Sequence, residues 1–406
     1  MNRIKKVYCR VFQGGFRVAI PLLPYREPAI INSIEEVVQL LIDKKIKRLL
    51  LVTDKGIKRL GLTKPFEEGL RKVGIHLFTY DETVANPTIE NVEAARKQYL
   101  RNQCQGILAV GGGSAIDCAK ATGARIVKPK QSVHAMKGIL KIHKSIPLLI
   151  AVPTTAGTGS ETTVAAVITD EKTSRKYPIN DFPLIPDYAV LLPELTVGLP
   201  KNLTSTTGLD ALTHAVEAYI GRSTTKKTRR QAIEAIKLIF KYLPIAYNEP
   251  NNLKARRAML QAAYLAGGAF TVSYVGYVHA IAHSLGGLYH TPHGLANSIL
   301  LPYVLEGYGI HAHKKLWKLA VETGLVTADR TYQEGAKAFI AKIWELNRQM
   351  EIPIAIPEIK EKDIPIMARY ADQEANPLYP VPMLLNAEEL EPFYRMVKNA
   401  ITVEEG

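Results

Sequence analysis

The chain contains little cysteine and no long apolar run, and both shortages narrow the class of protein. Its 406 residues include only 3 cysteines, Cys9, Cys104 and Cys118, and none of them belongs to a C-x-x-C motif. Such an odd and sparse set supports neither a disulfide framework nor a zinc site built from thiolates. No apolar run approaches the roughly 18 residues that a membrane span requires. We therefore expect a cytoplasmic protein with no membrane partner.

Positive charge exceeds negative charge, with 52 Lys and Arg against 38 Asp and Glu and a net charge of +14. This excess raises a nucleic-acid binder as a rival hypothesis. The cations are, however, scattered over helix-like segments, and neither an aromatic-rich basic strip nor a nucleic-acid module signature is visible. Solvated helix faces with some attraction for anionic ligands explain the charge better, so we expect no nucleic-acid partner.

The hydrophobic pattern changes character near residue 205. Before it, short apolar strands alternate with helical patterns, which indicates a parallel sheet covered on both faces. After it, long helical patterns dominate. We predict an α/β dinucleotide-binding domain over 1–205 and an all-helical domain over 206–406. Strands are expected at 47–54, 75–80, 106–110, 147–152, 164–169, 175–179 and 187–192, and helices at 34–45, 64–73, 88–102, 206–220, 227–246, 252–268, 279–287, 294–306, 332–350 and 387–400.

A glycine-rich segment, Gly111 to Ser114, follows a predicted strand and opens a helix. Glycines let backbone N–H groups approach a phosphate closely, and the helix N-terminus adds positive potential. The segment departs from the G-x-G-x-x-G fingerprint because Ile116 occupies the place of the last glycine. Asp117 has capping-box spacing from Ser114, an interpretation that is compatible with phosphate binding. The pattern indicates a nucleotide domain of a non-standard kind.

Two further features lie at predicted strand ends. Asp54 ends the first of these strands, where a carboxylate suits a ribose hydroxyl and repels a 2′-phosphate; a plain turn aspartate is an equal alternative. The loop PTTAGTGSE at 153–161 suits either nucleotide contacts or a tight turn capped by Ser160. Loops at the carboxyl ends of neighbouring strands mark the crevice where open α/β sheets bind ligands.

Histidines concentrate in one short segment. Four of the 10 histidines, His279, His283, His290 and His293, lie within HAIAHSLGGLYHTPH at 279–293. Imidazole is the commonest protein ligand for transition metals, so the set favours a metal or catalytic site over satisfied polar histidines. Helical spacing pairs His279 with His283, whereas the Thr-Pro turn brings His293 back towards the helix.

The first helix of the second half contains Asp210 and His214, which are four residues apart in GLDALTHAVEAY at 208–219. They share one face of an otherwise apolar helix, where burial is costly unless they satisfy each other or bind something. One alternative is a hydrogen-bonded pair. The other is half of a metal site completed by two histidines of 279–293, and residue chemistry alone does not choose these two. One carboxylate with several imidazoles suits Fe²⁺ or Zn²⁺.

Taken in order, these motifs resemble those of the iron-containing (group III) alcohol dehydrogenases, and the resemblance covers nearly the whole chain. It implies an N-terminal dinucleotide-binding domain and a C-terminal helical metal domain, an architecture also found in dehydroquinate synthase. The motifs are VTD at 52–54, NPT at 86–88, GGGSAID at 111–117, PTTAGTGSE at 153–161, GLDALTHAVEAY at 208–219 and HAIAHSLGGLYHTPHG at 279–294.

The resemblance also implies residue roles. Metal ligands are expected at Asp210, His214, His279 and His293. His283 corresponds to a non-ligand histidine facing substrate and nicotinamide, and is the candidate proton relay. The cofactor-binding positions are Asp54, Asn86, Gly112, Gly113, Ser114, Thr154, Thr155, Thr158, Thr163 and Lys176, with Asp117 added at the start of the same helix. An acid at position 54 is typical of members that prefer NAD over NADP.

The function that the resemblance implies is reversible hydride transfer between a small alcohol or diol and NAD. Fe²⁺, with Zn²⁺ as the alternative, would polarise the alcohol or carbonyl oxygen. The expected partners are a small-molecule alcohol or aldehyde and further copies of the chain, as a homodimer or larger homo-oligomer. The alternatives are a zinc-dependent polyol dehydrogenase, a lyase of the dehydroquinate synthase type on the same scaffold, and a non-enzymatic nucleotide- or metal-binding protein.

Overall fold

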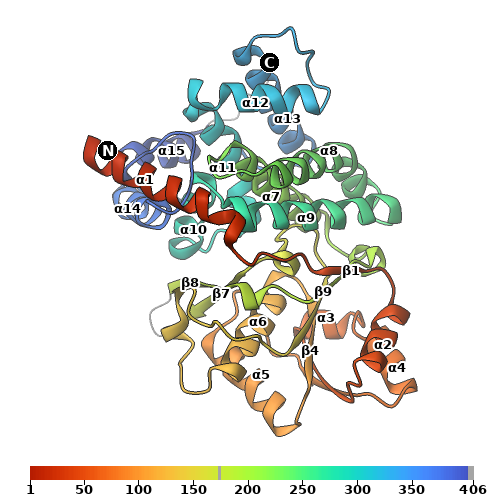
Figure 1. Cartoon of the computed structure of the whole chain (residues 1–406). Helices are drawn as coiled ribbons and strands as arrows, with labels where there is room; N and C mark the ends of the chain where they lie inside the picture. Colours follow the sequence, from red (N-terminus) through yellow and green to blue (C-terminus); the bar gives the residue numbers. More distant parts are fainter. Residues whose placement is uncertain (172–174, 401–406) are drawn as a thin grey trace. The chain divides into compact units, whose positions relative to one another are not determined.

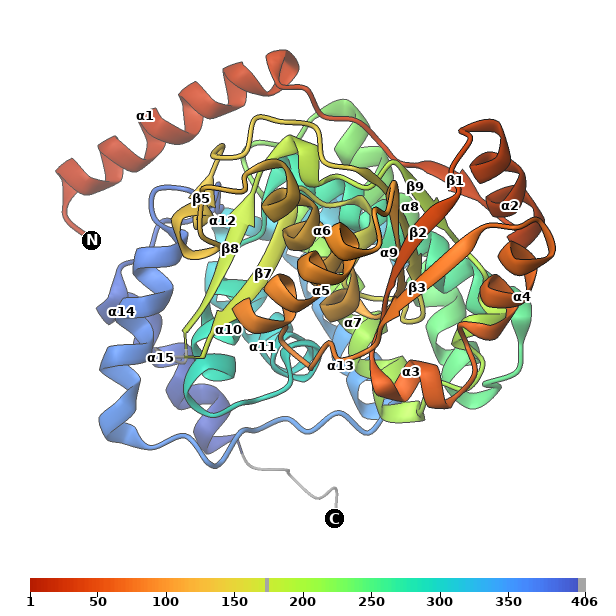
Figure 2. The same cartoon turned by 90° about the horizontal axis from the view of Figure 1, so that it is seen from below.

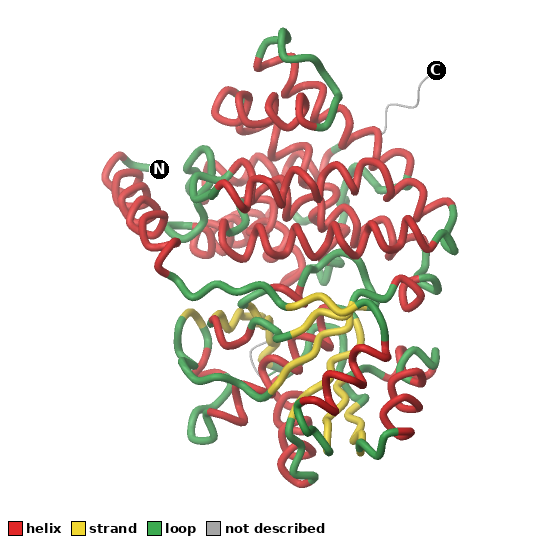
Figure 3. The backbone as a smooth tube through the Cα atoms, turned by 45° about the vertical axis from the view of Figure 1, so that its right-hand side comes forward, coloured by secondary structure: helices red, strands yellow, loops and turns green. Residues whose placement is uncertain are grey.

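The computed structural model describes residues 1–171 and 175–400. The chain divides into two compact units, and all its described strands, yellow in Figure 3, belong to the second. Unit 1 comprises Met1–Leu23, Pro200–Pro250 and Gly268–Gly406, and unit 2 comprises Pro24–Leu199 and Asn251–Gly267. The predicted division at residue 205 differs from these units in two places, because residues 1–23 belong with the helical unit and residues 251–267 with the α/β unit.

Unit 2, part of whose sheet is labelled in Figure 1, is built on a six-stranded sheet. Its strand order is β1-β9-β6-β4-β2-β3. All neighbouring strands are parallel, as predicted. The strands are β1 (Ala29–Ile31), β2 (Arg48–Val52), β3 (His76–Tyr80), β4 (Gly106–Gly111), β6 (Leu148–Pro153) and β9 (Tyr188–Val190). The chain runs outward from β2 to β3 and then returns to the other side of β2 as β4. The carboxyl ends of β2 and β4 therefore flank the switch point where open α/β sheets bind ligands.

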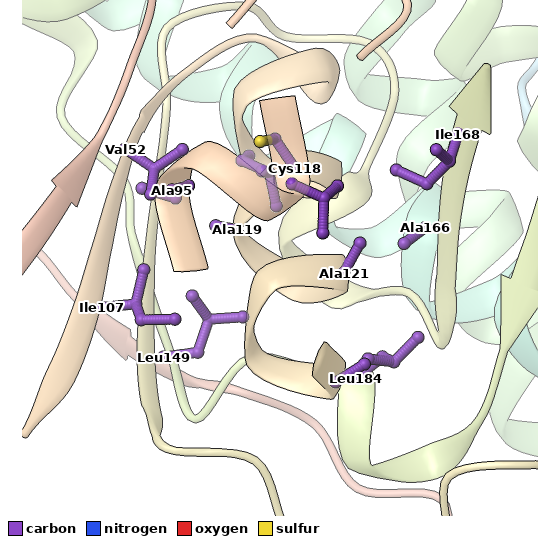
Figure 4. Packing of buried hydrophobic residues seen from close by; sticks show 14 of the residues in the cluster. Val52, Ala95, Ile107, Cys118, Ala119, Ala121, Leu149, Ala166, Ile168 and Leu184 are labelled. Atoms are coloured by element: carbon purple, nitrogen blue, oxygen red, sulfur yellow. The ribbon is translucent and has the colours of Figure 1, made fainter. Parts of the chain in front are cut away.

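Helices cover both faces of this sheet (Figure 2). On one face, α2 (Ile34–Asp43) and α4 (Lys64–Lys72) pack on alternate strand residues such as Leu49 and Leu108. On the other, α5 (Ile89–Arg101) and α6 (Gly113–Val127) pack on Ile107 and Leu149, as Figure 4 shows. Burial on both faces explains why these strands are continuously apolar instead of alternating.

A smaller sheet corrects one prediction. The strands expected at 164–169 and 175–179 form the antiparallel pair β7 (Ala165–Asp170) and β8 (Arg175–Asn180), with β5 (Gly138–Ile139) on the other side of β8. Their assignment to the parallel sheet was wrong. A parallel connection needs a crossover of about a dozen or more residues, and only residues 171–174 separate these two strands.

Unit 1 is helical, as predicted. Its central helix α7 is buried along most of its length, from Thr204 to Ile220. It packs against α8 and α11, and α11 in turn packs against α10. The helices are α1 (Arg3–Ala19), α7 (Lys201–Ile220), α8 (Lys226–Asn248), α10 (Tyr277–Leu288), α11 (His293–Tyr308), α12 (Ile310–Glu322), α13 (Tyr332–Gln349), α14 (Ile364–Ala375) and α15 (Ala387–Asn399), and α9 (Leu253–Ser273) contributes to both units. No single helix in the described ranges is long and apolar enough to cross a membrane; α9 and α10 meet that test only as a pair bent by 101°.

Hydrogen bonds to a distant part of the sequence hold α1 in unit 1. Arg10 donates to the carbonyl oxygen of Val381 at 2.8 Å, and Gln13 donates to that of Tyr379 at 2.8 Å. Cys9, on the same helix, is also buried. Because these partners lie more than 350 positions away in the chain, local sequence patterns cannot reveal that residues 1–23 leave the α/β unit.

Candidate metal and cofactor sites

Four side chains from three helices of unit 1 converge into what we call the metal cluster: Asp210 and His214 on α7, His279 on α10 and His293 on α11. Their ligand atoms all lie within 4.8 Å of one another. The Asp210 Oδ1 atom is 3.8 Å from Nε2 of His279 and 3.4 Å from Nε2 of His293. Metal bonds of about 2.0–2.2 Å hold donor atoms roughly 3–4.5 Å apart, so the cluster has room for one small cation. His283 is not among these four.

Burial makes a cation the natural partner of this cluster. Asp210 and His279 are each 2% exposed, and Nε2 of His279 has no hydrogen-bond partner among the described residues. Burial, and then the neighbouring imidazoles, lower the pKa of His279 well below its usual value, which keeps the ring in the neutral form that binds metal. One carboxylate and three imidazoles match the donors that Fe²⁺ and Zn²⁺ accept.

The start of α11 brings His293 to α7. The predicted Thr-Pro turn ends at Pro292, which precedes the first residue of the helix. At Gly294, a Cβ atom would lie 2.5 Å from the carbonyl oxygen of Thr206, so only glycine lets the two backbones approach this closely. The close approach of α11 and α7 joins residues that are about 80 positions apart in the sequence.

Glu217 orients one residue of the metal cluster and was not predicted from the sequence. Its carboxylate accepts hydrogen bonds from the N–H groups of Gly276 and Val278 at 2.8 Å each and lies 2.6 Å from Nδ1 of His279. With Nδ1–H donating to this carboxylate, Nε2 of His279 faces Asp210. Burial raises the pKa of Glu217 to about 7, against the lowering effect of its donors. Glu217 could have been predicted from its position, because it follows Asp210 by seven residues and so lies on the same face of the helix.

Asn297 and Phe270 also contact the metal cluster without having been predicted. The Nδ2 atom of Asn297 donates to Oδ1 of Asp210 at 2.7 Å and lies 3.1 Å from Nε2 of His293. Asn297 follows His293 by one helical turn and is fully buried. The ring of Phe270 stacks on His214 with 4.1 Å between ring centroids. Both contacts restrict how the ligands can turn.

His283 lies beside the metal cluster, on the more exposed side. Its side chain is 39% exposed and stacks on the ring of His293 with centroids 5.1 Å apart. Its Nδ1 atom is 2.6 Å from Oε1 of Glu374 on α14, and the same oxygen accepts a hydrogen bond from the Tyr379 hydroxyl at 2.7 Å. Glu374 and Tyr379 were not anticipated from sequence. His290 is not one of the four residues of the metal cluster.

In unit 2, Asp54 and the glycine-rich segment meet at the switch point of the sheet. Asp54 caps the short helix α3 (Lys55–Arg59), with Oδ1 accepting the Ile57 N–H at 2.9 Å. Its Oδ2 would lie 3.8 Å from a Cβ atom placed on Gly111. Asp54 therefore has a local capping role, which leaves its second carboxylate oxygen beside the glycine-rich loop.

The threonine loop at 153–161 packs directly on the glycine-rich segment. The Thr154 N–H donates to the carbonyl oxygen of Gly111 at 3.0 Å, and a Cβ atom on Gly113 would meet Thr158 at 3.0 Å. A Cβ atom on Gly112 would lie 3.6 Å from Thr155. The Asn86 N–H donates to the Ser114 hydroxyl at 3.2 Å, which brings the predicted Asn-Pro-Thr segment to the same place.

Asp117 has a different local role from the predicted capping box. The N-cap of α6 is Gly112, and the carboxylate of Asp117 accepts hydrogen bonds from the Ser160 hydroxyl and from the Val167 N–H at 3.0 Å. The capping-box interpretation was wrong because the helix begins before Ser114. Asp117 is partly buried and ties the threonine loop and β7 to α6.

The last two predicted cofactor positions lie near β7. The buried Nζ of Lys120, on α6, donates to both the carbonyl and the hydroxyl oxygens of Thr163 at 2.8 Å. Burial lowers the pKa of Lys120 to about 8. Lys176 lies on β8 opposite Thr169, and the described contacts do not join its side chain to the glycine-rich segment.

Comparisons with known proteins match both units. The family described as "Iron-containing alcohol dehydrogenase" matches residues 30–193, and "Fe-containing alcohol dehydrogenase family, C-terminal" matches residues 204–397. The 1,3-propanediol dehydrogenase of Klebsiella pneumoniae is 37% identical over 390 residues, which cover 94% of this chain and 98% of the relative. A crystal structure of 1,3-propanediol oxidoreductase is similar with a TM-score of 0.87 at 36% identity, covering 92% of this chain and 99% of its own. The crystal structure of sulfoacetaldehyde reductase from Bifidobacterium kashiwanohense in complex with NAD⁺ is similar with a TM-score of 0.83 at 27% identity. The match covers 93% of this chain and 99% of the reductase chain.

Proposed function

The chain belongs to the iron-containing alcohol dehydrogenase family, and from this premise we propose how its own residues serve an NAD-dependent alcohol oxidation. It is a metal-dependent alcohol dehydrogenase. In our proposal Asp210, His214, His279 and His293 hold Fe²⁺, with Zn²⁺ as the alternative. When bound, the cation supplies a Lewis acid for the substrate oxygen. The observation that carries this assignment is the convergence of one carboxylate and three imidazoles within 4.8 Å.

The surrounding residues hold these ligands in place. Glu217 keeps the proton of His279 on Nδ1 and so directs Nε2 towards Asp210. Asn297 fixes Oδ1 of Asp210, and Phe270 limits rotation of the His214 ring. Ligands that are oriented before the cation arrives lose less freedom on binding it, which favours a tightly held metal.

His283 is the residue to which we assign proton movement. It adjoins the metal cluster through His293 and is partly exposed, so it can pass a proton between the site and water. Its Nδ1 atom faces Glu374, and we therefore assign Nε2 as the atom that accepts the proton of the alcohol. The hydrogen-bonded pair of Glu374 and Tyr379 holds the ring in this orientation.

The NAD site is assigned to the switch point of unit 2. Bound nicotinamide supplies the hydride acceptor. Backbone N–H groups at Gly112 and Gly113, at the start of α6, suit the pyrophosphate, and Asp54 suits a ribose hydroxyl. The remaining contacts are assigned to Asn86, Ser114, Thr154, Thr155, Thr158, Thr163 and Lys176. Asp117 is assigned an indirect part, since its carboxylate is occupied in holding the threonine loop.

We further propose that the substrate is a small primary alcohol or diol and that the enzyme acts in the cytoplasm as a homodimer or larger homo-oligomer. The names of relatives that act on 1,3-propanediol support the substrate class. A zinc-dependent polyol dehydrogenase is the alternative. Metal analysis after anaerobic purification, joined to an NAD-coupled screen of alcohols, diols and polyols, separates these functions. Asp210→Asn should lose both metal and activity, and full activity without bound metal would overturn the assignment.

A further inference from the structure

The helix α1 turns a row of apolar side chains towards solvent. The exposed fractions of Ile4, Val7, Val11 and Val18 are 82%, 57%, 69% and 76%. At about 100° per residue these positions fall on one side of the helix, and we call them the apolar stripe. Leu22, in the short helical turn that follows α1, extends the stripe and is 86% exposed. Exposed side chains of this size, gathered on one face, mark an interaction surface.

The apolar stripe is not the face by which α1 packs on its own chain. Cys9, Gln13 and Ile20, on the opposite side, are buried. Phe16 meets Tyr274 edge to face with 5.1 Å between centroids. Figures 1 and 2 show α1 at the periphery of its unit. The helix is therefore held by the side opposite the apolar stripe, which leaves the stripe outward.

Positive charge accompanies the apolar stripe. Arg3, Lys6, Arg10 and Arg17 follow at helical spacing and form a row along one flank of α1, and no acidic residue occurs between Arg3 and Ala19. Arg10 donates to backbone carbonyls. Arg3, Lys6 and Arg17 form no ion pair with any carboxylate among the described residues.

More cations lie next to this flank on neighbouring helices. Lys315 on α12 is close enough to Arg222, Arg229 and Arg17 for their charges to lower its pKa, after the larger effect of burial, to about 8. An open cavity of about 730 Å³ is lined mainly by residues of α8 and α12, and Glu322 is the one acidic residue in its lining. Its basic lining residues are Lys226, Arg229, Arg230 and Lys318. None of these four forms an ion pair in the part of the chain that the structure describes.

We propose that the apolar stripe and its cationic flank bind the surface of an anionic lipid membrane. The helix would lie in the headgroup layer, with the stripe buried and the arginines and lysines on phosphate groups. The positive charge of α1 favours an anionic lipid surface over a second copy of the chain as the partner. Two paired α1 helices would bring their cations together, and neither helix contains an acidic residue to offset the repulsion. The expectation of no membrane partner rested on the lack of a spanning run, which does not bear on a helix that lies in the surface.

The first test is co-sedimentation of the full-length protein with vesicles of phosphatidylcholine alone or with about one third phosphatidylglycerol. We expect binding only to the anionic vesicles, and at least tenfold weaker binding for the double variant Val11→Glu, Val18→Glu. Ile310→Glu is the matched control, since Ile310 is 81% exposed on α12, outside the stripe. Alcohol dehydrogenase activity in solution, which does not involve α1, verifies that each variant is folded.

The second test separates charge from apolar contact. Arg3→Glu with Lys6→Glu should weaken binding several-fold and reduce its dependence on salt. Lys97→Glu, at an exposed position on α5, should do neither. Equal binding to neutral and anionic vesicles, or no binding to either, would overturn the proposal. So would stripe variants that bind lipid normally but change the oligomeric mass in sedimentation, because that outcome assigns the stripe to a second copy of the chain.

Discussion

Replacing Glu217 by glutamine tests whether this carboxylate prepares His279 for the metal. The carboxylate serves three donors, the N–H groups of Gly276 and Val278 and Nδ1 of His279. Glutamine has the same size but only one acceptor oxygen. With that oxygen facing His279 and Gly276, its NH₂ group opposes the Val278 N–H. A buried donor without an acceptor costs about 1–3 kcal/mol.

The metal should be held more weakly in this variant, because a neutral amide orients and polarises His279 less than a carboxylate does. Loss of such an outer partner lowers metal affinity about 10–100-fold, or about 1.4–2.7 kcal/mol. Chelator competition followed by metal analysis measures the affinity directly. Excess metal should restore most of the activity, since none of the four proposed ligands is removed.

Glu234→Gln provides the matched control, because Glu234 is exposed on the neighbouring helix α8. It should change neither metal affinity nor activity. The reasoning fails if Glu217→Gln retains metal as tightly as the parent protein. It also fails if activity is lost at full metal occupancy, because that result would place Glu217 in the reaction and not behind the ligand.

Three other predictions concern different parts of the molecule. His283→Ala should lower turnover by about 10²–10⁴-fold while metal content is unchanged, and loss of metal in this variant would make His283 a ligand instead. Asp54→Gly should improve the use of NADP relative to NAD in initial-rate assays, and an unchanged ratio would refute the ribose assignment. Burial raises the pKa of Glu161 from 4.5 to about 7. Between these two pH values the folded chain keeps a proton on Glu161 that the unfolded chain has lost. The free energy of unfolding therefore falls as the pH rises from 4.5 to about 7. Glu161→Gln should therefore exceed the parent in unfolding free energy by about 1–3 kcal/mol above pH 7 and match it near pH 4.5; a difference independent of pH in denaturant titrations would contradict this origin.

Local patterns in the sequence were enough to place most of the elements. Strands buried on both faces are continuously apolar, and this is why β2, β4 and β6 were found with their parallel arrangement. The same patterns put Asp54 and the glycine-rich segment at strand ends, because a polar residue or glycine stops an apolar run. Asp210 and His214 were found as a pair since helical spacing alone puts them on one face.

Tertiary structure decided which distant groups meet. Helical spacing offered His283 as the partner of His279, yet His293 reaches Asp210 because α11 starts against α7. Glu217 was visible in the sequence as a polar residue on an apolar helix, but its three donors come from another part of the chain. The docking of α1 likewise depends on carbonyl groups more than 350 positions away. Periodicity records only neighbours along the chain, whereas the choice of ligand and of docking surface depends on contacts that form when the helices pack.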